Sequence, residues 1–384
     1  MSSHTGSGPG RVAYFISPHG FGHASRAAAA MAATQELDPA VRFEIFTQVP
    51  PWFFEQSLSA PFGYHPLLTD IGLAQKSPLV EDLPGTLRLL RDFIPFDERH
   101  IDQVAGRVNQ LGCHLVVCDI SPLGLAVARA AGIPSMLVEN FTWDWIYEGY
   151  LAQDDRFRPF IAHLRQVFAQ ADYHVQTEPV CRPNQTALTT PPVCRQIRTP
   201  PLRVRQQLGI PAKAKAVLVT LGGIPWQYPW LDRLAGQTDA YFVIPGVDQT
   251  EPLPKGAALG ASRLRPLPRK SAYHHPDLVN ACDAAIGKVG YSTLAEVVHA
   301  GVPFGYIQRP LFRESQVLTA YIQTHHNGLP ITEAQLEDGS WLDALEDLLA
   351  LPRQGQRQVN GATQIARFLS QLLPGHASRP GNPP

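Results

Sequence analysis

The sequence predicts an α/β protein with two halves of similar size, each built on a parallel sheet, that face each other across a cleft. Three observations support this fold class. Short apolar runs alternate with helix-like segments in both halves, which is typical of βαβ units. Glycine-containing turns follow apolar runs near residues 17–26 and 287–290. A proline-rich stretch over 179–201 separates the two series and is typical of a linker.

In the first half, four apolar runs predict strands, and two longer segments predict helices. The strands are expected over 12–16, 41–46, 114–118 and 133–138. The helices are expected over about 84–110 and about 122–131, and the second should close at Gly132.

The second half repeats this alternation. Strands are expected over 216–220, 241–244, 284–286 and 303–307, and a helix over 293–300 that ends at Gly301. Apolar residues between Ile365 and Leu373 have helical spacing. We therefore expect an N-terminal domain over 11–178, a linker over 179–201, a C-terminal domain over 202–355, a C-terminal helix over 356–373 and a disordered tail over 374–384.

Composition excludes several classes of protein. Of the 384 residues, 44% are hydrophobic and the net charge is −1 without a long basic run, so nucleic acid is not an expected partner. No run is long enough to span a bilayer, and the N-terminus lacks the pattern of a signal peptide. The cysteines show no CxxC spacing, so we expect a cytoplasmic protein without a disulfide framework or a metal site: Cys113, Cys118, Cys181, Cys194 and Cys282.

The turn from Ser17 to Arg26 (SPHGFGHASR) is the most informative segment. It follows the first predicted strand, and ligands of α/β sheets bind at the carboxyl ends of strands. Glycine lets a backbone approach a ligand closely, and histidine transfers protons near neutral pH. The alternative is a tight turn between strand and helix with no ligand.

The segment from Asp283 to Glu296 (DAAIGKVGYSTLAE) is its counterpart in the second half. Free amides at the start of the helix favour an anion such as a diphosphate, and Lys288 adds a positive charge. Two alternatives remain open here. Thr293 and Glu296 have the spacing of a capping box, and Lys288 would then be an ordinary lysine on the solvent-exposed surface.

These motifs resemble the GT-B glycosyltransferases, and most closely the glycosyltransferase-like halves of plant L-arabinokinases and their bacterial relatives. The resemblance rests on four segments in the same order: 19–26, 117–122, 139–147 and 287–296. It spans about residues 11–330. The helix region of the last segment is also similar to the N-acetylglucosaminyltransferase that forms lipid II. The resemblance implies a GT-B fold, with two Rossmann-like domains facing across a cleft.

The resemblance does not extend to every property of these relatives. Arabinokinases carry a large C-terminal sugar-kinase domain beyond the matched part, so kinase activity is not expected of this chain. The histidine-containing nucleotide loop of many plant glycosyltransferases is absent. Lys288 and Gly290 occupy that region, which leaves the identity of the nucleotide open.

For the catalytic residues, the resemblance implies a histidine base that faces the acceptor and an aspartate that orients it. His23 matches the Gly-His of the family signature, His19 lies close by, and Asp119 matches the aspartate. The alternatives are turn residues bonded to the backbone for the histidines, and a helix N-cap for Asp119.

For the binding residues, the resemblance implies two groups. Glu296 would bind ribose hydroxyls, and Glu314 would contact the donor sugar unless it is an ordinary first-turn carboxylate. The remaining donor-side candidates are Gly222, Gly223, Lys288, Gly290, Tyr291, Ser292 and Thr293. The acceptor-side candidates are Gly20, Phe21, Gly22, Trp143 and Trp145. The two tryptophans alternate with Tyr147 on an expected loop that forms a wall of the acceptor pocket. The alternative is that these aromatic residues are part of the core.

The expected function is transfer of a sugar from a nucleotide sugar, expected to be UDP-linked, to a hydroxyl of a small or lipid-linked acceptor. The expected transfer inverts the anomeric centre, needs no metal, and brings the protein to a membrane only through its acceptor. The alternative is a non-catalytic GT-B module that binds sugar or nucleotide as a regulator or scaffold. A dinucleotide oxidoreductase is disfavoured, because Ser25 replaces the third fingerprint glycine and Glu44 lies within the second strand.

Overall fold

The computed structural model describes residues 10–77, 79–222, 230–235, 239–247, 263–355 and 359–374. The chain forms two compact units, and each is built from separate stretches of sequence. Unit 1 comprises residues 1–74, 83–193 and 360–384, and unit 2 comprises residues 75–82 and 194–359. The chain therefore passes between the units four times.

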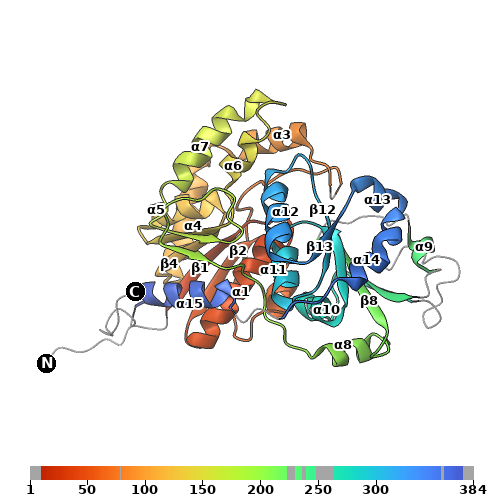
Figure 1. The fold of residues 1–384 in the computed structure, drawn as a ribbon. Coiled ribbons are helices and arrows are strands. Elements are labelled where there is room, and N and C mark those ends of the chain that lie inside the picture. The colour runs from red at the N-terminus through yellow and green to blue at the C-terminus, as the bar shows by residue number, and fades with distance from the viewer. Residues whose placement is uncertain are drawn as a thin grey trace. The chain divides into compact units, whose positions relative to one another are not determined.

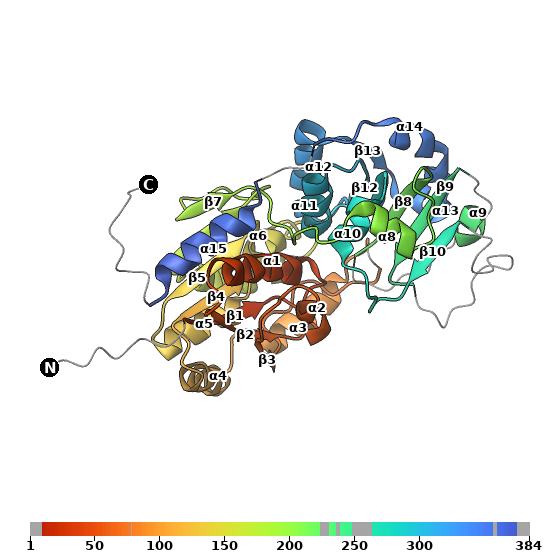
Figure 2. The same ribbon diagram turned by 90° about the horizontal axis from the view of Figure 1, so that it is seen from below.

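Unit 1 is a seven-stranded parallel sheet with the order β3-β2-β1-β4-β5-β6-β7 (Figures 1 and 2). The adjacent strands β1 and β4 are in register from Val12 opposite Leu115 to Ile16 opposite Asp119. The strands are β1 (Arg11–Ile16), β2 (Arg42–Thr47), β3 (Gly63–Pro66), β4 (Leu115–Asp119), β5 (Ser135–Glu139), β6 (Tyr173–Thr177) and β7 (Leu188–Thr190).

Helices cover this sheet, and their order along the chain follows the predicted βαβ alternation. They are α1 (Gly22–Leu37), α2 (Pro51–Glu55), α3 (Leu83–Phe93), α4 (Glu98–Gln110), α5 (Pro122–Ala131), α6 (Trp143–Glu148), α7 (Arg158–Phe168) and α15 (Gly361–Leu372), with a 3₁₀ turn at Asp155–Phe157. The helix expected over 122–131 is confirmed, including its end at Gly132.

The single helix expected over 84–110 is wrong. The segment forms α3 and α4, which are separated by residues 94–97. Pro95 has no backbone N–H, and its ring hinders continuation of the preceding helix. Asp97 then starts α4, because its carboxylate accepts a hydrogen bond from the amide of Arg99 at 3.0 Å.

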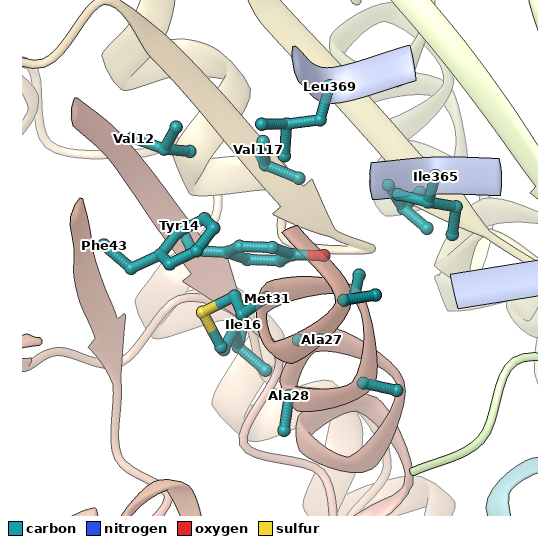
Figure 3. Close-up of a cluster of buried hydrophobic side chains, with 14 of the residues drawn as sticks. Val12, Tyr14, Ile16, Ala27, Ala28, Met31, Phe43, Val117, Ile365 and Leu369 are labelled. Carbon is teal, nitrogen blue, oxygen red and sulfur yellow. The ribbon is translucent and has the colours of Figure 1, made fainter. Parts of the chain in front are cut away.

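One apolar core joins β1 to α1 and α15. Tyr14 of β1 and Met31 of α1 are fully buried and lie with Ile365 and Leu369 of α15 in one cluster (Figure 3). Helices α1 and α15 are in contact, and they lie side by side in Figures 1 and 2. The C-terminal helix thus completes unit 1, although most of unit 2 precedes it in the sequence.

Unit 2 is a six-stranded parallel sheet with the order β10-β9-β8-β11-β12-β13. The strands are β8 (Lys215–Thr220), β9 (Ala240–Pro245), β10 (Leu264–Leu267), β11 (Ala284–Lys288), β12 (Phe304–Ile307) and β13 (Gly328–Ile331). The helices are α8 (Pro201–Gln207), α9 (Leu231–Ala235), α10 (His275–Ala281), α11 (Tyr291–Ala300), α12 (Arg313–His325), α13 (Glu333–Asp338) and α14 (Leu345–Ala350), with a 3₁₀ turn at Ser340–Ala344. The strand order reverses between β8 and β11, which is where open α/β sheets bind ligands.

The stretch 179–201 is more structured than a linker. It contains β7, which pairs with β6 through Val175 and Leu188, and it ends at the first residue of α8. The boundary between the units falls between residues 193 and 194. β7 is an edge strand and only three residues long, so its prolines on either side do not interrupt a ladder.

Two further expectations concern the chain as a whole. The predicted tail lies outside the described residues from residue 375 onward. Among the residues that are described, no helix is long and apolar enough to cross a membrane.

Candidate functional site

The first candidate site lies at the carboxyl ends of β1 and β4. The turn after β1 contains Gly20, which has a φ of +71°, and α1 begins at Gly22. His23 is therefore in the first turn of α1, while Asp119 is the last residue of β4. Because β1 and β4 are adjacent and parallel, these two side chains meet at the same edge of the sheet.

His23 and Asp119 form a direct hydrogen bond, with 3.0 Å between Nδ1 and Oδ1. Asp119 is completely buried and also accepts two hydrogen bonds from Arg26, at 2.8 Å from Nε and 2.6 Å from Nη2. Arg26 Nη1 donates to Asn140 at 2.7 Å and to Thr177 at 3.3 Å. The structure thus brings His23 and Asp119 together within a buried polar network.

Arg26 controls the ionisation of Asp119. Burial alone would raise the pKa of this carboxyl, but the Arg26 charge and the hydrogen bonds from His23 and Arg26 outweigh it, so the pKa is lowered. The N-cap alternative for Asp119 is wrong, because Ser121 caps α5 by accepting a hydrogen bond from the Gly124 amide at 3.2 Å. Asp119 is a buried carboxylate that orients a histidine and binds an arginine.

His19 lies in a different environment from His23. It is half-buried, and its Nδ1 accepts a hydrogen bond from the Leu73 amide at 3.4 Å. Its ring meets Trp143 edge to face, with 5.2 Å between ring centroids. Gly72 packs directly on the ring, since a Cβ at that position would lie 2.7 Å from His19 Nδ1. The contact with the Leu73 amide matches the alternative of a turn residue bonded to the backbone.

Asp70 belongs to this site and was missed in the sequence. It is buried and accepts hydrogen bonds from the Ser17 hydroxyl at 2.9 Å and from Trp143 Nε1 at 3.2 Å. Burial raises the pKa of Asp70 to about 7, although both hydrogen bonds oppose the shift. The sequence had no signal for Asp70, because the strand before it, β3, was not predicted and no spacing links Asp70 to Ser17 or Trp143.

The predicted acceptor-side aromatics lie on a helix rather than a loop. Trp143, Trp145 and Tyr147 are buried residues of α6. Tyr147 donates its hydroxyl proton to the Gly72 carbonyl at 2.6 Å and stacks on Trp143 with 5.9 Å between centroids. Phe21 stacks on Phe53 at 4.9 Å and so joins the edge of the core. The role of these residues toward an acceptor stays a prediction.

The second candidate site lies in unit 2, at the carboxyl ends of β8 and β11. Gly222 follows β8 with a φ of +80°, and a Cβ there would lie 3.3 Å from Lys288 Cε. Glycine satisfies both this backbone conformation and the close approach of Lys288. Gly223 lies outside the described residues.

Helix α11 starts directly beyond Lys288. Gly290 is its N-cap residue, and no neighbouring atom lies within 4 Å of where a Gly290 Cβ would be. Tyr291, Ser292 and Thr293 form the first turn, in which backbone N–H groups have no intrahelical acceptor. This arrangement fits an anion site, as the sequence predicts, and binding at these residues stays a prediction.

Glu296 lies one turn inside α11 and has two partners. Arg195 Nη2 is 3.1 Å from Oε1, and His275 Nδ1 is 2.5 Å from Oε2. Burial would raise the pKa of Glu296, but His275 and Arg195 lower it to about 2. The capping-box alternative is wrong, since the N-cap is Gly290 and not Thr293. Both carboxylate oxygens are already engaged, so a ribose would have to share them.

Glu314 is a buried residue in the first turn of α12. Its charge, with that of Glu81, raises the pKa of Lys288, but burial and the Arg309 charge dominate and lower that pKa to about 7. Within the described ranges, no three His, Cys, Asp or Glu side chains are placed to hold a metal ion.

Comparison with known proteins places this geometry in context. No family model matches the chain. The chain is 25% identical to the L-arabinokinase of Arabidopsis thaliana over 374 residues, which is 94% of this chain. It spans about a third (34%) of the length of that protein.

Two solved structures align along nearly the whole chain. One is a complex of a UDP-glucosyltransferase from Polygonum tinctorium, with a TM-score of 0.61, 14% identity and coverage of 96% of this chain and 99% of the other. The other is MurG of Acinetobacter baumannii, with a TM-score of 0.55, 14% identity and coverage of 94% of this chain and 100% of the other. The chain has the GT-B glycosyltransferase fold. The predicted resemblance and the prediction of two Rossmann-like domains are thereby confirmed.

Proposed function

We propose that this GT-B protein is an enzyme that transfers a sugar from a nucleotide sugar to a hydroxyl acceptor. The observation that carries the proposal is the hydrogen bond of 3.0 Å between His23 and Asp119. It lies at the carboxyl edge of the unit 1 sheet, where α/β proteins bind ligands. A histidine held by a buried carboxylate is a recurring arrangement for general base catalysis.

The hydrogen bond determines which nitrogen of His23 reacts. Asp119 is ionised, because its pKa is lowered, so its Oδ1 accepts a hydrogen bond from the N–H at His23 Nδ1. The neutral ring then carries its lone pair on Nε2, which takes the proton of the acceptor hydroxyl. The acceptor oxygen attacks the anomeric carbon, the bond from that carbon to the phosphate oxygen breaks, and the nucleoside diphosphate leaves. One displacement of this kind inverts the anomeric centre.

Unit 2 is proposed to bind the donor. The start of α11 offers positive charge to a diphosphate, and a bound anion would favour the charged form of Lys288, so the proposed transfer needs no metal ion. The Polygonum tinctorium protein is by name a UDP-glucosyltransferase, which supports a UDP-linked donor here. The acceptor is proposed to be a small or lipid-linked hydroxyl compound. The kinase activity implied by the name of the L-arabinokinase is not included in the proposal.

The test is a panel of nucleotide sugars, with hydrolysis and transfer measured for the wild type, His23→Ala and Asp119→Asn. His100→Ala is the matched control, since His100 is an exposed residue of α4. We expect turnover with at least one donor, a large loss in both site variants and no change in the control. Binding of a donor without turnover in the wild type would reject the enzyme and leave the binding module.

The non-catalytic module is the second candidate, because one observation favours it. Arg26 binds Asp119 through two hydrogen bonds and extends to Asn140 and Thr177, so the same network also holds β4, β6 and the residue that follows β5 to α1. Such a network would serve a binding module without catalysis. The two candidates separate in His23→Ala, which removes the proposed base and leaves every hydrogen bond between Arg26 and Asp119 in place.

A further inference from the structure

The segment over residues 69–73 crosses the carboxyl ends of β1 and β4 in unit 1, and we call it the crossing segment. The Thr69 hydroxyl donates to the Ile16 carbonyl at 2.7 Å, and the Ser121 hydroxyl donates to the Thr69 carbonyl at 3.2 Å. Ile16 is the last residue of β1, and Ser121 follows the last residue of β4 by two positions. The crossing segment is therefore fixed to the sheet edge that carries the proposed base.

The turn after β4 has a strained backbone where it meets the crossing segment. Ile120 is fully buried and has a φ of +46°, a conformation that is unfavourable for a β-branched residue. It lies between Asp119, whose carbonyl accepts a hydrogen bond from the Ser17 amide at 3.3 Å, and Ser121, which binds the crossing segment. Strain of this kind persists only where the surrounding contacts fix the backbone. This edge of the sheet is therefore held in one geometry by the fold itself.

Asp70 is the residue through which the crossing segment binds two further elements. Its Oδ1 accepts a hydrogen bond from the hydroxyl of Ser17, in the turn after β1, at 2.9 Å. Its Oδ2 accepts a hydrogen bond at 3.2 Å from Nε1 of Trp143, the first residue of α6. The Ser17 hydroxyl also accepts a hydrogen bond from the His19 amide at 3.4 Å. Asp70 thus links the turn that carries His19 to the start of α6.

The Trp143 ring contacts both histidine rings of the site. Its centroid lies 5.2 Å from that of His19, edge to face, and 6.2 Å from that of His23. The indole is buried, and its one polar atom, Nε1, donates to Asp70. Because Asp70 fixes that atom, it also fixes the plane of the indole against which the two histidine rings pack.

A second set of contacts leads from Trp143 back to the crossing segment. Trp143 stacks on Tyr147, whose hydroxyl donates to the Gly72 carbonyl at 2.6 Å. Gly72 has a φ of +62°, and a Cβ there would lie 2.7 Å from His19 Nδ1. Glycine satisfies both this conformation and the close approach to the ring. The crossing segment therefore holds α6 at two points, through Asp70 and through Gly72.

We propose that Asp70 is a positioning residue for the proposed base His23, and that it acts by holding the Trp143 ring as a fixed wall against the imidazole. The single hydrogen bond from His23 to Asp119 leaves the ring free to rock about that bond, and the wall restricts this motion. The proposal rests on the proposed function of His23 in transfer. It gives Asp70 a role in turnover and none in donor binding, which is proposed for unit 2.

The first test separates turnover from donor affinity. Asp70→Ala removes the acceptor for Trp143 Nε1 and should lower kcat by about 10- to 100-fold, because a displacement of about 1 Å near the reacting atoms costs up to about 100-fold. The affinity for UDP, measured by calorimetry, should stay unchanged. Asp70→Asn keeps an acceptor for Nε1 and should retain most of the turnover. Asp102→Asn, on the exposed face of α4, is the matched control and should behave like the wild type.

NMR signals of the His23 ring protons give a second measurement, which needs no turnover. An aromatic ring shifts the signals of protons beside it, so these signals report how His23 lies against Trp143. Asp70→Ala should move them, whereas Asp70→Asn should leave them close to the wild type. Trp143→Phe keeps a ring but removes the N–H, so adding Asp70→Ala to it should have no further effect. Trp143→Phe should also lower kcat without changing UDP affinity, and it serves if Asp70→Ala fails to fold.

The outcomes separate the positioning role from the enzyme. Equal losses of turnover in Asp70→Ala and Asp70→Asn, or His23 signals that do not move in Asp70→Ala, would overturn the positioning role. Sugar transfer by the wild type with unchanged kcat in Asp70→Ala would overturn only that role. A wild type without turnover, in which the His23 signals move in Asp70→Ala and not in Asp70→Asn, would reject the enzyme and support Asp70 as the residue that holds the ring.

Discussion

Asp119 in unit 1 and Lys288 in unit 2 are both ionisable residues at the carboxyl end of a parallel strand, but among the described residues only Asp119 contacts its counter-charge directly. Arg26 and His23 contact Asp119 directly and hold its pKa low. Lys288 has Arg309 as a neighbouring cation, and its pKa is lowered to about 7. The charge of Asp119 is therefore compensated by direct contacts, whereas the charged form of Lys288 is disfavoured by burial and by Arg309.

This difference corresponds to two roles: the Asp119 network is ordered before a substrate binds, whereas the charge of Lys288 depends on a bound ligand. A base must be oriented before its substrate arrives, and the network around Asp119 provides that orientation. A site for a charged donor gains affinity when the ligand supplies the missing charge. We therefore expect a nucleoside diphosphate to stabilise the protein against unfolding, because it binds only the folded state.

Removal of the proposed base should give the largest effect. We expect His23→Ala to lower turnover by about 10²- to 10⁴-fold, the usual contribution of general base catalysis, with little change in donor affinity. Steady-state kinetics and calorimetry with the same donor measure the two quantities. Parallel losses of turnover and donor affinity would instead place His23 in the donor site.

Removal of the carboxylate should lower stability in addition to turnover. Asp119→Ala leaves the buried Arg26 charge without its partner, and breaking a buried pair in this way costs about 3–5 kcal/mol. Asp119→Asn keeps an acceptor and should cost less. Urea unfolding measures both variants. A free energy of unfolding unchanged in Asp119→Ala would show that Asn140 and Thr177 alone hold Arg26.

Much of unit 1 could be predicted because its signals are local. Apolar runs identified β1, β2, β4 and β5 but not β3, β6 or β7, and Gly132 marked the end of α5. The pairing of His23 with Asp119 followed from strand ends and from the family resemblance. Arg26 was missed as their partner, although it lies three residues after His23 and so on the same face of α1.

The remaining features depend on contacts between distant residues. The packing of α15 on α1 joins residues more than 300 positions apart, and the ion pair of Glu81 with Arg309 joins an early loop to a late strand end. No periodicity encodes such pairs. The partners of Glu296, which are Arg195 and His275, were hidden for the same reason, so its T-x-x-E spacing indicated a capping box that the helix does not form.

Glu296 provides a test of intermediate size. Its pKa is about 2 in the fold and near 4.5 in an unfolded chain, so its contribution to stability is present above pH 4.5 and is lost as the pH falls toward 2. We expect Glu296→Gln to lower the free energy of unfolding by about 1–3 kcal/mol at neutral pH. The variant should also lose less stability than the wild type as the pH falls from 4.5 toward 2. If the loss in the free energy of nucleotide binding exceeds the loss in the free energy of unfolding, the ribose role of Glu296 would be supported instead.

Asp70 should give the smallest effect, with the opposite dependence on pH. Its pKa rises from 3.8 to about 7 on folding, so the protonated form stabilises the fold below pH 3.8, and this contribution is lost as the pH rises toward 7. Asp70→Asn cannot titrate and loses one acceptor for Ser17 or Trp143. It should be about 1 kcal/mol less stable than the wild type at acidic pH. The difference should shrink and then reverse in sign as the pH rises toward 7, because only the wild type loses stability when its carboxyl ionises.

Urea unfolding between pH 4 and 8 measures this difference, with Asp102→Asn on the exposed face of α4 as the control. Asp70 lies beside Trp143 and near the segment that packs on His19, so the same titration should change how that segment is held. A wild type and an Asp70→Asn variant with parallel pH profiles would show that Asp70 is ionised throughout. Ser17 and Trp143 would then stabilise a buried carboxylate at Asp70, as Arg26 does at Asp119. Both buried carboxylates of unit 1 would be compensated by contacts within the fold, and Lys288 of unit 2 would remain the contrasting case.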